Sequence, residues 1–410
     1  MAVALSHTHV VIDHLNPSGE GVVRGVGGSI FVPMALPGET IAIGDNKQIV
    51  EIITRSADRV MPFCPEFGRC GGCAMQHMHI DAYGQWKHDT VQRALERDGF
   101  NADVSPTRIV HGKGRRRAVV HVRFGPKGPV AGFMTSKSHD LLPIETCPIL
   151  TPELQDIFKI ARAVTTPLSG RNKPLDVQVT VTINGLDVDI RGHGTLDTKE
   201  RLRLTDVATF LDLARLSVHR DIVVERKTPT INVGDIPVIL PARAFLQATD
   251  AGEDTLAQLV IAGVGKAKSV ADLFCGVGPF ALRLAKTARV YAADDGKEAI
   301  AALDRAVRSR QGLKPVTAEV RDLFRRPLLP MELAAFDVVV MDPPRAGAEA
   351  QVQQISASKV KKVVSVSCDL QSFIRDAKIL AAGGFVLDSV TPVDQFAWSK
   401  HIELVGIFNR

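Results

Sequence analysis

Residues 269–280 read Ser-Val-Ala-Asp-Leu-Phe-Cys-Gly-Val-Gly-Pro-Phe, an apolar run that ends in a glycine-rich turn. The run predicts a buried strand, and Gly276 and Gly278 allow the turn to approach a ligand closely. A dinucleotide fold would carry a third glycine where this chain has Ala281. Asp272 precedes the glycines, and a carboxylate there suits a ligand with an ammonium group better than one with a phosphate.

The whole segment 264–410 alternates short apolar runs with stretches of helical period, which predicts a doubly wound parallel sheet. The predicted strands are 269–274, 289–294, 315–322, 336–342, 361–367, 385–393 and 401–409. The predicted helices are 280–287, 297–310, 349–358 and 370–382. Too few residues separate the last two strands for a helical crossover, so we expect them to pair antiparallel. Seven strands that end in such a hairpin resemble the Rossmann-like α/β fold of class I methyltransferases.

Ligands of open α/β sheets bind at the carboxyl ends of the strands. The chemically active residues at these ends are Asp272, Asp294, Asp322, Asp342 and Cys368. One acid at a strand end is commonly a helix cap, but five such residues on one edge favour a ligand site. Asp294 ends the second strand, where a carboxylate accepts hydrogen bonds from a ribose diol. S-adenosyl-L-methionine carries an amino acid and a ribose but no phosphate, and is the expected cofactor.

Cys368 lies one strand beyond Asp342-Pro-Pro-Arg345. A free thiol has a pKa of about 8.5, so a few per cent is thiolate at neutral pH, and that fraction is strongly nucleophilic. Enzymes that methylate exocyclic amines have an aromatic residue where this chain has Arg345. C5 of uracil becomes reactive only when a thiolate adds to C6, which Cys368 can supply. The alternative is that Cys368 is a small buried hydrophobe without chemistry.

A second group of cysteines lies in the first half of the chain, three of them in one loop and the fourth far downstream. They are Cys64, Cys70, Cys73 and Cys147. No signal peptide or membrane-spanning apolar stretch is evident, so we expect a cytoplasmic, reducing location and a metal rather than disulfides. Zinc and a [4Fe–4S] cluster both accept four thiolates, and three close cysteines with one remote partner favour the cluster.

Together these motifs resemble the RNA (uracil-5-)-methyltransferases over nearly the whole chain. The likeness rests on Phe245-Leu-Gln247, Asp272–Phe280, Asp342–Arg345, Ser367-Cys368 and His401-Ile-Glu403, which follow in the family's order. The cofactor-site residues that it implies are Gln247, Phe274, Asp294 and Asp342, with Asp322 as a further candidate. It also implies that Cys368 is the nucleophile and that Glu403 removes the C5 proton. The family often has Glu where this chain has Asp294.

The resemblance divides the chain into three parts. Residues 1–55 alternate apolar and polar side chains between glycine turns, which predicts an OB-like β-barrel similar to the TRAM module. Residues 56–240 form a central domain, where the family's cysteine signature implies a [4Fe–4S] cluster. A helix at 81–100 in this part is a candidate to pack on the catalytic domain. Residues 241–410 form the methyltransferase domain.

RNA is the expected partner, with no membrane and no obligate protein partner evident. The net charge is only +5, but residues 108–127 contain several arginines and lysines without any acid, which favours phosphate contacts. Aromatic residues make up 5% of the chain, so phosphate contacts should outweigh base stacking. Relatives that modify transfer RNA typically lack the barrel and the cluster, so the resemblance implies 23S ribosomal RNA, with transfer RNA as the alternative.

Two other functions stay open at this point. The first is a catalytically inactive iron-sulfur protein that binds RNA or senses redox state, against which the intact Cys368, Glu403 and Asp342 argue. The second is methylation of cytosine C5, which also uses a thiolate. Those enzymes more often present it after a Pro-Cys turn, and no such turn surrounds Cys368.

Overall fold

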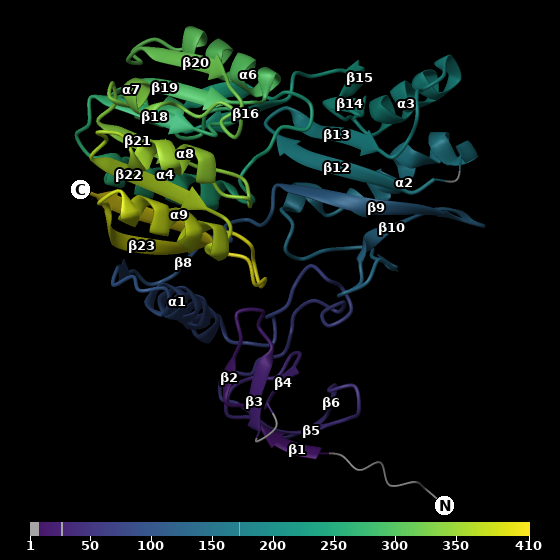
Figure 1. Ribbon diagram of the computed structural model, residues 1–410. Coiled ribbons are helices and arrows are strands. Elements are labelled where there is room, and N and C mark those ends of the chain that lie inside the picture. The colour runs from purple at the N-terminus through teal and green to yellow at the C-terminus, as the bar shows by residue number, and fades with distance from the viewer. Residues whose placement is uncertain (1–7, 26–27, 172) are drawn as a thin grey trace, which may run out of the picture.

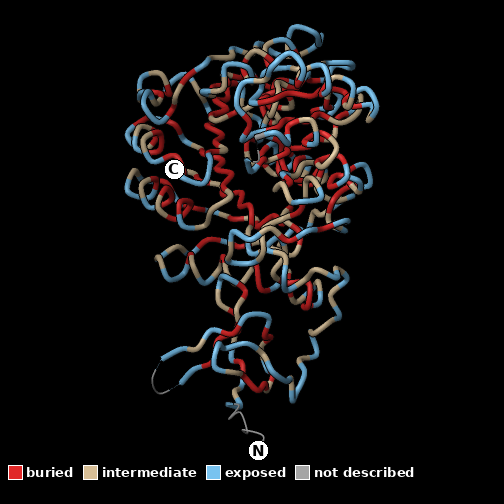
Figure 2. Tube along the Cα trace, turned by 90° about the vertical axis from the view of Figure 1, so that its right-hand side faces the viewer, coloured by how far each residue is buried: buried red, intermediate tan, exposed pale blue. Residues whose placement is uncertain are grey.

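The structure, a computed structural model, describes residues 8–25, 28–171 and 173–410. Residues 1–7 and 26–27 of the predicted barrel, and 172 of the predicted central domain, lie outside the described residues. Three β-rich bodies follow one another along the chain, with the N-terminal one set apart below the other two (Figure 1). Figure 2 shows that buried chain runs through the two upper bodies. Within the described ranges, no helix is both long and apolar enough to cross a membrane.

The N-terminal body consists of two three-stranded antiparallel sheets, in the orders β1-β5-β6 and β2-β3-β4. The strands are β1 Thr8–Val11, β2 His14–Leu15, β3 Gly21–Gly25, β4 Gly28–Val32, β5 Thr40–Ile43 and β6 Ile49–Thr54. Their shared core is small and includes Ile12, Val32 and Ile41. The short, turn-rich strands agree with the sequence pattern, while the assignment to the TRAM module stays a prediction.

The middle body is a seven-stranded sheet in the order β11-β10-β9-β12-β13-β14-β15. Its strands are β9 Arg117–Gly125, β10 Gly128–Met134, β11 Leu141–Pro143, β12 Leu175–Thr182, β13 Gly185–Arg191, β14 Arg215–Val218 and β15 Asp221–Glu225. Its helices are η1 Pro152–Leu154, α2 Ile157–Thr165, η2 Thr166–Arg171 and α3 Thr198–Phe210. The apolar residues of α2 and α3 form one core with the strands, with Phe158 and Leu204 fully buried.

The C-terminal body contains all seven predicted strands, in the order β20-β19-β18-β21-β22-β24-β23. They are β18 Ser269–Leu273, β19 Arg289–Asp294, β20 Val316–Val320, β21 Val338–Met341, β22 Lys362–Ser367, β23 Val386–Asp394 and β24 Glu403–Asn409. The helices are α4 Asp250–Val264, α5 Ala281–Leu284, α6 Lys297–Ser309, α7 Pro330–Leu333, α8 Glu349–Ser356 and α9 Leu370–Ala382. Strand β24 is antiparallel and lies between β22 and β23. The predicted α/β methyltransferase fold is confirmed.

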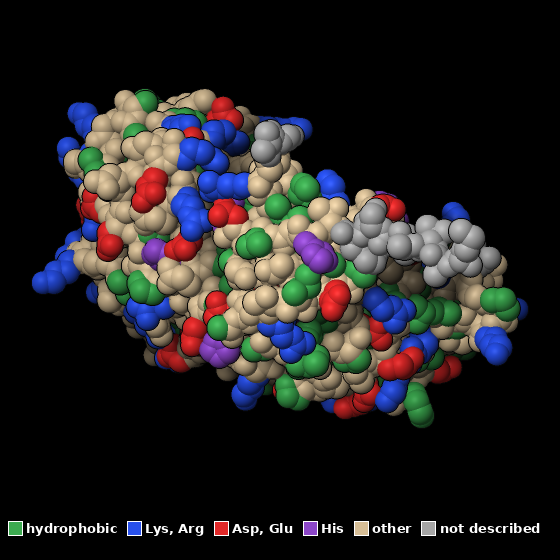
Figure 3. All heavy atoms as spheres, turned by 90° about the horizontal axis from the view of Figure 1, so that it is seen from below, with side chains coloured by type: hydrophobic (Ala, Val, Ile, Leu, Met, Phe, Trp, Pro, Cys, Tyr) green, Lys and Arg blue, Asp and Glu red, His purple; other side chains and the backbone are tan. Residues whose placement is uncertain are grey.

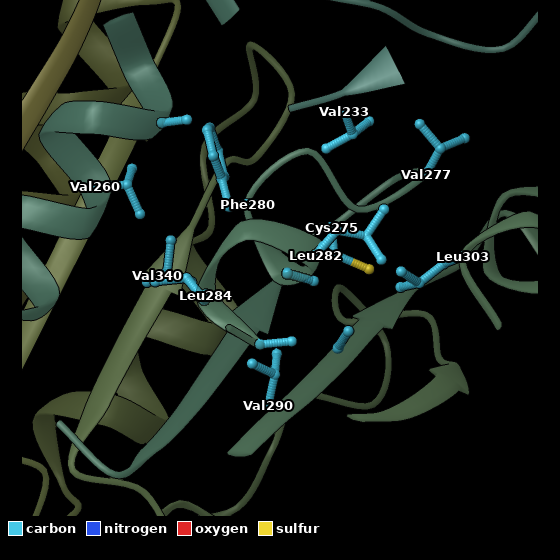
Figure 4. Packing of buried hydrophobic residues seen from close by; sticks show 14 of the residues in the cluster. Val233, Val260, Cys275, Val277, Phe280, Leu282, Leu284, Val290, Leu303 and Val340 are labelled. Atoms are coloured by element: carbon cyan, nitrogen blue, oxygen red, sulfur yellow. The ribbon is translucent and has the colours of Figure 1, made fainter. Parts of the chain in front are cut away.

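Two apolar cores cover the faces of this sheet. Figure 4 shows part of one core, in which Val260 of α4, Leu303 of α6 and Val340 of β21 surround the start of α5. The sulfur of Cys275 lies inside this cluster, and only 3% of the residue is exposed. Cys275 therefore packs the core. A hairpin of β16 Thr230–Val233 and β17 Ile236–Ile239 belongs to the same core.

Segments from the first half of the chain extend the catalytic sheet, which the sequence pattern did not predict. Strands β7 Asp103–Val104 and β8 Arg108–Ile109 pair in parallel with β23, and two residues are too few to show a period. The predicted helix forms as α1 Ile80–Arg97 and packs beside β23 (Figure 1). These segments precede residue 240 but pair with or pack on the catalytic sheet. The domain boundaries at 55 and 240 therefore stay predictions.

Candidate active site

Cys368 and Glu403 are brought together by the antiparallel pairing of β22 with β24. Ser367 ends β22 opposite Leu404, so the residue after β22 and the residue that opens β24 lie at the same edge of the sheet. Cys368 is half-buried there. Burial, followed by the negative charges of Glu403 and Asp342, raises the pKa of the Cys368 thiol to about 11, and Arg345 opposes this rise.

Glu403 is almost fully buried, with 3% of its surface exposed. Its Oε1 accepts a hydrogen bond from Nε2 of Gln395 at 3.2 Å, whereas Oε2 has no partner among the described residues. Burial, and then the charge of Asp342, raises the pKa of Glu403 well above its ordinary value. One carboxylate oxygen is thus held in place while the other is free to take a proton.

Gln247 and Asp342 continue the same chain of hydrogen bonds. Nε2 of Gln247 donates to Oδ2 of Asp342 at 3.1 Å, and Oε1 of Gln247 accepts from Nε2 of Gln395 at 2.6 Å. Burial raises the pKa of Asp342 to about 7; the bond from Gln247 opposes this rise and the charge of Asp294 adds to it. Both residues come from segments that the sequence assigned to the cofactor site.

The glycine-rich turn after β18 carries the next predicted residues. The two oxygens of Asp294 accept from the amides of Gly276, at 3.0 Å, and Gly296, at 2.8 Å. Phe274 adopts a left-handed backbone with φ +62°, and its ring centroid lies 5.4 Å from that of Phe324. Such a conformation is uncommon outside glycine and marks this turn as a constrained one.

Asp322 is not joined to the other site residues by any described contact. Its Oδ1 accepts hydrogen bonds from the amides of Phe324 and Arg325 at 3.0 and 3.1 Å, so the carboxylate closes its own turn. Asp272 is the opposite case, because it is fully buried and neither of its oxygens has a hydrogen-bond partner among the described residues. Burial, and then the charge of Asp342, raises its pKa well above the ordinary value.

This edge of the sheet therefore gathers carboxylates that lack counter-charges. No ion pair within the described ranges involves the four acids Asp272, Asp294, Asp342 and Glu403. Buried carboxylates are costly unless a cation or hydrogen bonds compensate them. A ligand with positive charge lowers that cost. The sulfonium and ammonium groups of S-adenosyl-L-methionine supply two such charges.

Comparison with known proteins agrees with this geometry. Residues 216–410 match the family described as tRNA (Uracil-5-)-methyltransferase. An uncharacterized RNA methyltransferase of Brucella suis is 43% identical over 404 residues, which cover 98% of this chain and 97% of that protein. The 23S rRNA (uracil(1939)-C(5))-methyltransferase RlmD of Pectobacterium carotovorum is 31% identical, with 99% of this chain and 95% of that protein covered. The chain belongs to the RNA (uracil-5-)-methyltransferase family.

A solved structure shares the whole architecture. The crystal structure of a Pyrococcus abyssi tRNA (uracil-54, C5)-methyltransferase in complex with S-adenosyl-L-homocysteine superposes with a TM-score of 0.74 at 23% identity, covering 98% of this chain and 99% of that one. At this identity the likeness concerns the fold. The protein is an RNA (uracil-C5)-methyltransferase that uses S-adenosyl-L-methionine as methyl donor.

The four cysteines of the first half of this methyltransferase line a single cavity, together with Phe67, Phe133 and Ile144. All four are free thiols. Burial raises the pKa of Cys73 to about 12 and that of Cys147 to about 11. Across the described residues, no three His, Cys, Asp or Glu side chains converge as they would around one metal ion. The predicted ligands share a cavity without forming the tight group that a single ion requires.

The loop between β23 and β24 connects this cavity with the active site. The carbonyl of Trp398 accepts hydrogen bonds from the amides of Ala74 and Met75, at 2.8 and 3.0 Å, directly after the cysteine loop. The ring centroid of Trp398 lies 5.1 Å from that of Tyr83 and 6.0 Å from that of Phe63. The loop that separates Gln395 from Glu403 is thus anchored on the cysteine region.

The base of this loop is fixed by buried charges. Asp394, fully buried, binds Nζ of Lys87 at 2.6 Å and Nε2 of His111 at 2.8 Å. Lys87 also donates to the carbonyl of His401 at 2.5 Å. Although burial alone would raise it, the hydrogen bond from His111 and the charge of Lys87 hold the pKa of Asp394 below its ordinary value. Lys87 and His111 thus both pair with Asp394 at the base of the loop.

Three consecutive arginines, the last of which opens β9, alternate in environment, as side chains of extended chain do. Arg116 is buried and pairs with Asp250 and with Glu253, the latter at 2.6 Å. Arg115 lies 5.9 Å from the centre of the Phe396 ring, and Arg117 lies 5.1 Å from that of Phe245. Neither Arg115 nor Arg117 has a described carboxylate partner. Burial, and then repulsion by Arg115 and other arginines, lowers the pKa of Arg117 to about 10.

Sequence reasoning missed Gln395, because a glutamine in a loop carries no period and no motif. It also left Asp272 out of the predicted cofactor-site residues, although a carboxylate at that strand end was expected to suit an ammonium group. The strongest signal for the arginines was the acid-free stretch 108–127, but it did not separate Arg116 from its neighbours. On the face shown in Figure 3, Lys and Arg are interspersed with Asp and Glu, so that face has no single-sign surface.

Proposed function

We propose that the enzyme methylates C5 of one uridine through a covalent bond between Cys368 and C6, and that Glu403 removes the C5 proton. The observation that carries this proposal is the placement of the thiol beside a buried carboxylate with one free oxygen. A thiolate and a proton acceptor at one strand edge are the two groups that this reaction needs.

Each proposed step has a group to perform it. The Cys368 thiolate adds to C6, and the electron pair of the C5–C6 double bond moves toward the C4 carbonyl, which makes C5 nucleophilic. When bound, S-adenosyl-L-methionine supplies the methyl group that C5 takes up. Oε2 of Glu403 then accepts the C5 proton, the double bond re-forms, and the thiolate leaves. Arg345 and a cationic ligand both favour the charged thiolate against the neighbouring acids.

The cofactor site proposed here consists of Gln247, Phe274, Asp294 and Asp342, with Asp322 kept as a candidate. The unpartnered oxygens of Asp272, at the same edge of the sheet, support binding of a positively charged ligand there. Asp294 stands at the end of the second strand, where its carboxylate can accept from a ribose diol. Asp342 is a further buried acid at this strand edge, and a positively charged ligand would compensate the burial that raises its pKa.

For the four cysteines we propose a [4Fe–4S] cluster with a structural role. The support is that Cys64, Cys70, Cys73 and Cys147 line one cavity as free thiols. A zinc ion holds sulfurs about 2.3 Å away, and the described cysteines do not form so tight a group. When bound, a cluster joins the loop 64–73 to the segment around Cys147. Anaerobically purified protein should contain iron and sulfide, and zinc without iron would overturn this proposal.

Large-subunit (23S) ribosomal RNA is the substrate that we propose. The full-length similarity to an enzyme named for 23S ribosomal RNA supports it, as do the N-terminal all-β body and the cysteine cavity. Transfer RNA is the second candidate, because the matched family is described as acting on transfer RNA. Mass spectrometry of 5-methyluridine in each RNA pool, from cells with and without the gene, decides between them.

The covalent step is tested with RNA that contains 5-fluorouridine. Fluorine at C5 cannot leave as a proton, so the wild-type enzyme should form a complex that survives denaturing electrophoresis. Cys368→Ala should form none. Cys275→Ala is the matched control, since Cys275 is a core residue, and it should retain the complex. An adduct that persists in Cys368→Ala would contradict the proposed nucleophile.

A further inference from the structure

Gln395 lies directly after β23, opposite the start of β24, and is fully buried. Its amide makes three hydrogen bonds. Oε1 accepts from the amide of Ala248 at 2.7 Å, while Nε2 donates to Oε1 of Gln247 at 2.6 Å and to Oε1 of Glu403 at 3.2 Å. A single side chain thus connects the backbone before α4 with both the proposed base and the proposed cofactor site.

The backbone donor fixes the direction of this whole network. A glutamine amide has one acceptor end and one donor end. The amide of Ala248 can only donate, so the oxygen of Gln395 must face it. Nε2 of Gln395 then faces Gln247 and Glu403, which turns the oxygen of Gln247 toward Gln395 and its Nε2 toward Asp342. Each amide has one orientation that satisfies all partners.

This orientation determines what Glu403 can do. The donated hydrogen bond occupies Oε1 and opposes the effect of burial on the Glu403 carboxyl group, which favours the ionised form that accepts a proton. Oε2 remains without a partner. Without the bond from Gln395, Oε1 would lose its one described partner, and burial and the charge of Asp342 would favour the protonated form still more.

Gln395 has little freedom to move. A Cβ on Gly252 would lie 2.8 Å from Cβ and 2.9 Å from Oε1 of Gln395, so the first turn of α4 packs directly on the side chain. The preceding residue, Asp394, is held by Lys87 and His111. Packing and the buried ion pairs therefore fix the amide from both sides.

We propose that Gln395 is a positioning residue for removal of the C5 proton, which it assists by orienting Glu403 and leaving Oε2 free for the substrate. In this step the C5–H bond breaks, the proton goes to Oε2, the electron pair re-forms the C5–C6 double bond, and Cys368 leaves as thiolate. The inference rests on the proposed function of Glu403 and Cys368. Its subject is the last step, whereas the bond from Gln395 to Gln247 bears on the cofactor site.

The test uses Gln395→Met, which keeps a side chain of similar length and removes the donor. With ordinary uridine RNA and a saturating concentration of methyl-labelled cofactor, which offsets the lost bond to Gln247, a single turnover should transfer the methyl group at a rate close to wild type. Release should slow about tenfold or more, so a labelled, gel-stable protein–RNA adduct accumulates. If Gln395 only supported the fold, the substitution would lower the rates of methyl transfer and of release together.

Gln351→Met is the matched control. Gln351 is also fully buried, and its side-chain amide bonds to the backbone of Leu328, at 2.8 and 3.2 Å, and to none of the proposed site residues. We expect a similar loss of stability without adduct accumulation. If Gln395→Met does not fold, Gln395→Asn keeps the amide but shortens its reach, and should accumulate the same adduct.

Two results would overturn the inference. One is release of product from the Gln395 variant within about twofold of wild type; the other is slow formation of the 5-fluorouridine adduct, which precedes any work by Glu403. Failure of the proposed function has a different signature. In that case the wild-type enzyme forms no 5-fluorouridine adduct, or Glu403→Gln releases product normally, whatever Gln395 does.

Discussion

Two groups of buried carboxylates lie at the same edge of the catalytic sheet and differ in their surroundings. Asp394 ends β23 and binds both Lys87 and His111. Asp272, only a few strands away in the sheet, is equally buried and has no partner for either oxygen among the described residues. The first carboxylate joins α1 to the catalytic sheet. The second is uncompensated in the ligand-free protein.

The difference separates structural charge from functional charge. A buried acid that has both hydrogen bonds and a counter-charge holds packed elements together. Removing one of its partners therefore destabilises the fold. A buried acid that lacks them costs stability, which is acceptable where a ligand later supplies the missing charge. Arg116 and Arg117 repeat the contrast with opposite sign. Arg116 is paired with carboxylates, whereas Arg117 has no described carboxylate partner and contacts the Phe245 ring and the carbonyl of Ala244.

The largest expected effect concerns the paired group. Lys87→Met removes the cation and leaves buried Asp394 with only His111 and the amide of Phe396, so the free energy of unfolding should fall by roughly 3–5 kcal/mol. Urea unfolding followed by circular dichroism measures this. The double variant Lys87→Met with Asp394→Asn should regain part of the loss, because no uncompensated carboxylate remains. A fall in the free energy of unfolding of less than about 1 kcal/mol in Lys87→Met would remove the contrast between paired Asp394 and unpartnered Asp272.

The unpartnered group should behave in the opposite way. Asp272→Asn removes a buried charge and should stabilise the ligand-free protein by about 1–2 kcal/mol, while affinity for S-adenosyl-L-methionine falls about tenfold to hundredfold. The folded state binds the Asp272 proton more tightly than the unfolded state, so wild-type stability falls as pH rises through the raised pKa. The gain in the variant should therefore be larger at alkaline pH. Destabilisation at all pH values would contradict this account.

Cofactor binding should depend on pH through Asp342. Burial raises the pKa of this carboxyl group to about 7, and a positively charged ligand binds best to its ionised form. Affinity should therefore drop about tenfold between pH 8 and about pH 6. Isothermal titration calorimetry measures the change, and Asp342→Asn should bind weakly with a flatter profile. An affinity that is independent of pH in the wild-type protein would show that Asp342 is ionised before the ligand arrives.

The smallest expected effect is that of the arginines. Arg117→Gln should weaken RNA binding and reduce the slope of log affinity against log salt by about 0.7, with stability nearly unchanged. Arg116→Gln breaks the pairs with Asp250 and Glu253 and should instead destabilise the protein. Filter binding at several salt concentrations and thermal unfolding separate the two. Equal salt slopes for Arg117→Gln and wild type would remove Arg117 from the RNA interface.

The sequence predicted the elements with strong local signals. All seven strands and the four helices of the methyltransferase region formed near their expected positions, because buried apolar runs and helical periods are local properties. Cys368 and Asp342 were visible because they directly follow such runs. The helix at 81–100 was also visible, and it lies beside β23.

Long-range partners were not predictable in the same way. Lys87 and Asp394 are separated by 307 positions, and nothing near either residue indicates the other. Gln395 acquires its contacts only when β23, β24 and α4 meet. Asp322 satisfied the strand-end pattern, yet its carboxylate accepts from two amides of its own turn. A residue type at a position shows what is chemically available, whereas the fold decides which partner it meets.

The insertion of β24 between β22 and β23 has a consequence for biosynthesis. The strand belongs to the interior of the sheet, although its residues 403–409 leave the ribosome after those of every strand that it joins. A nascent chain can pair its parallel strands early, but a slot stays open between β22 and β23 until β24 docks. Because Glu403 arrives with β24, the proposed proton acceptor joins the site after the parallel strands have been made, and polypeptides that stop before residue 403 are expected to lack turnover.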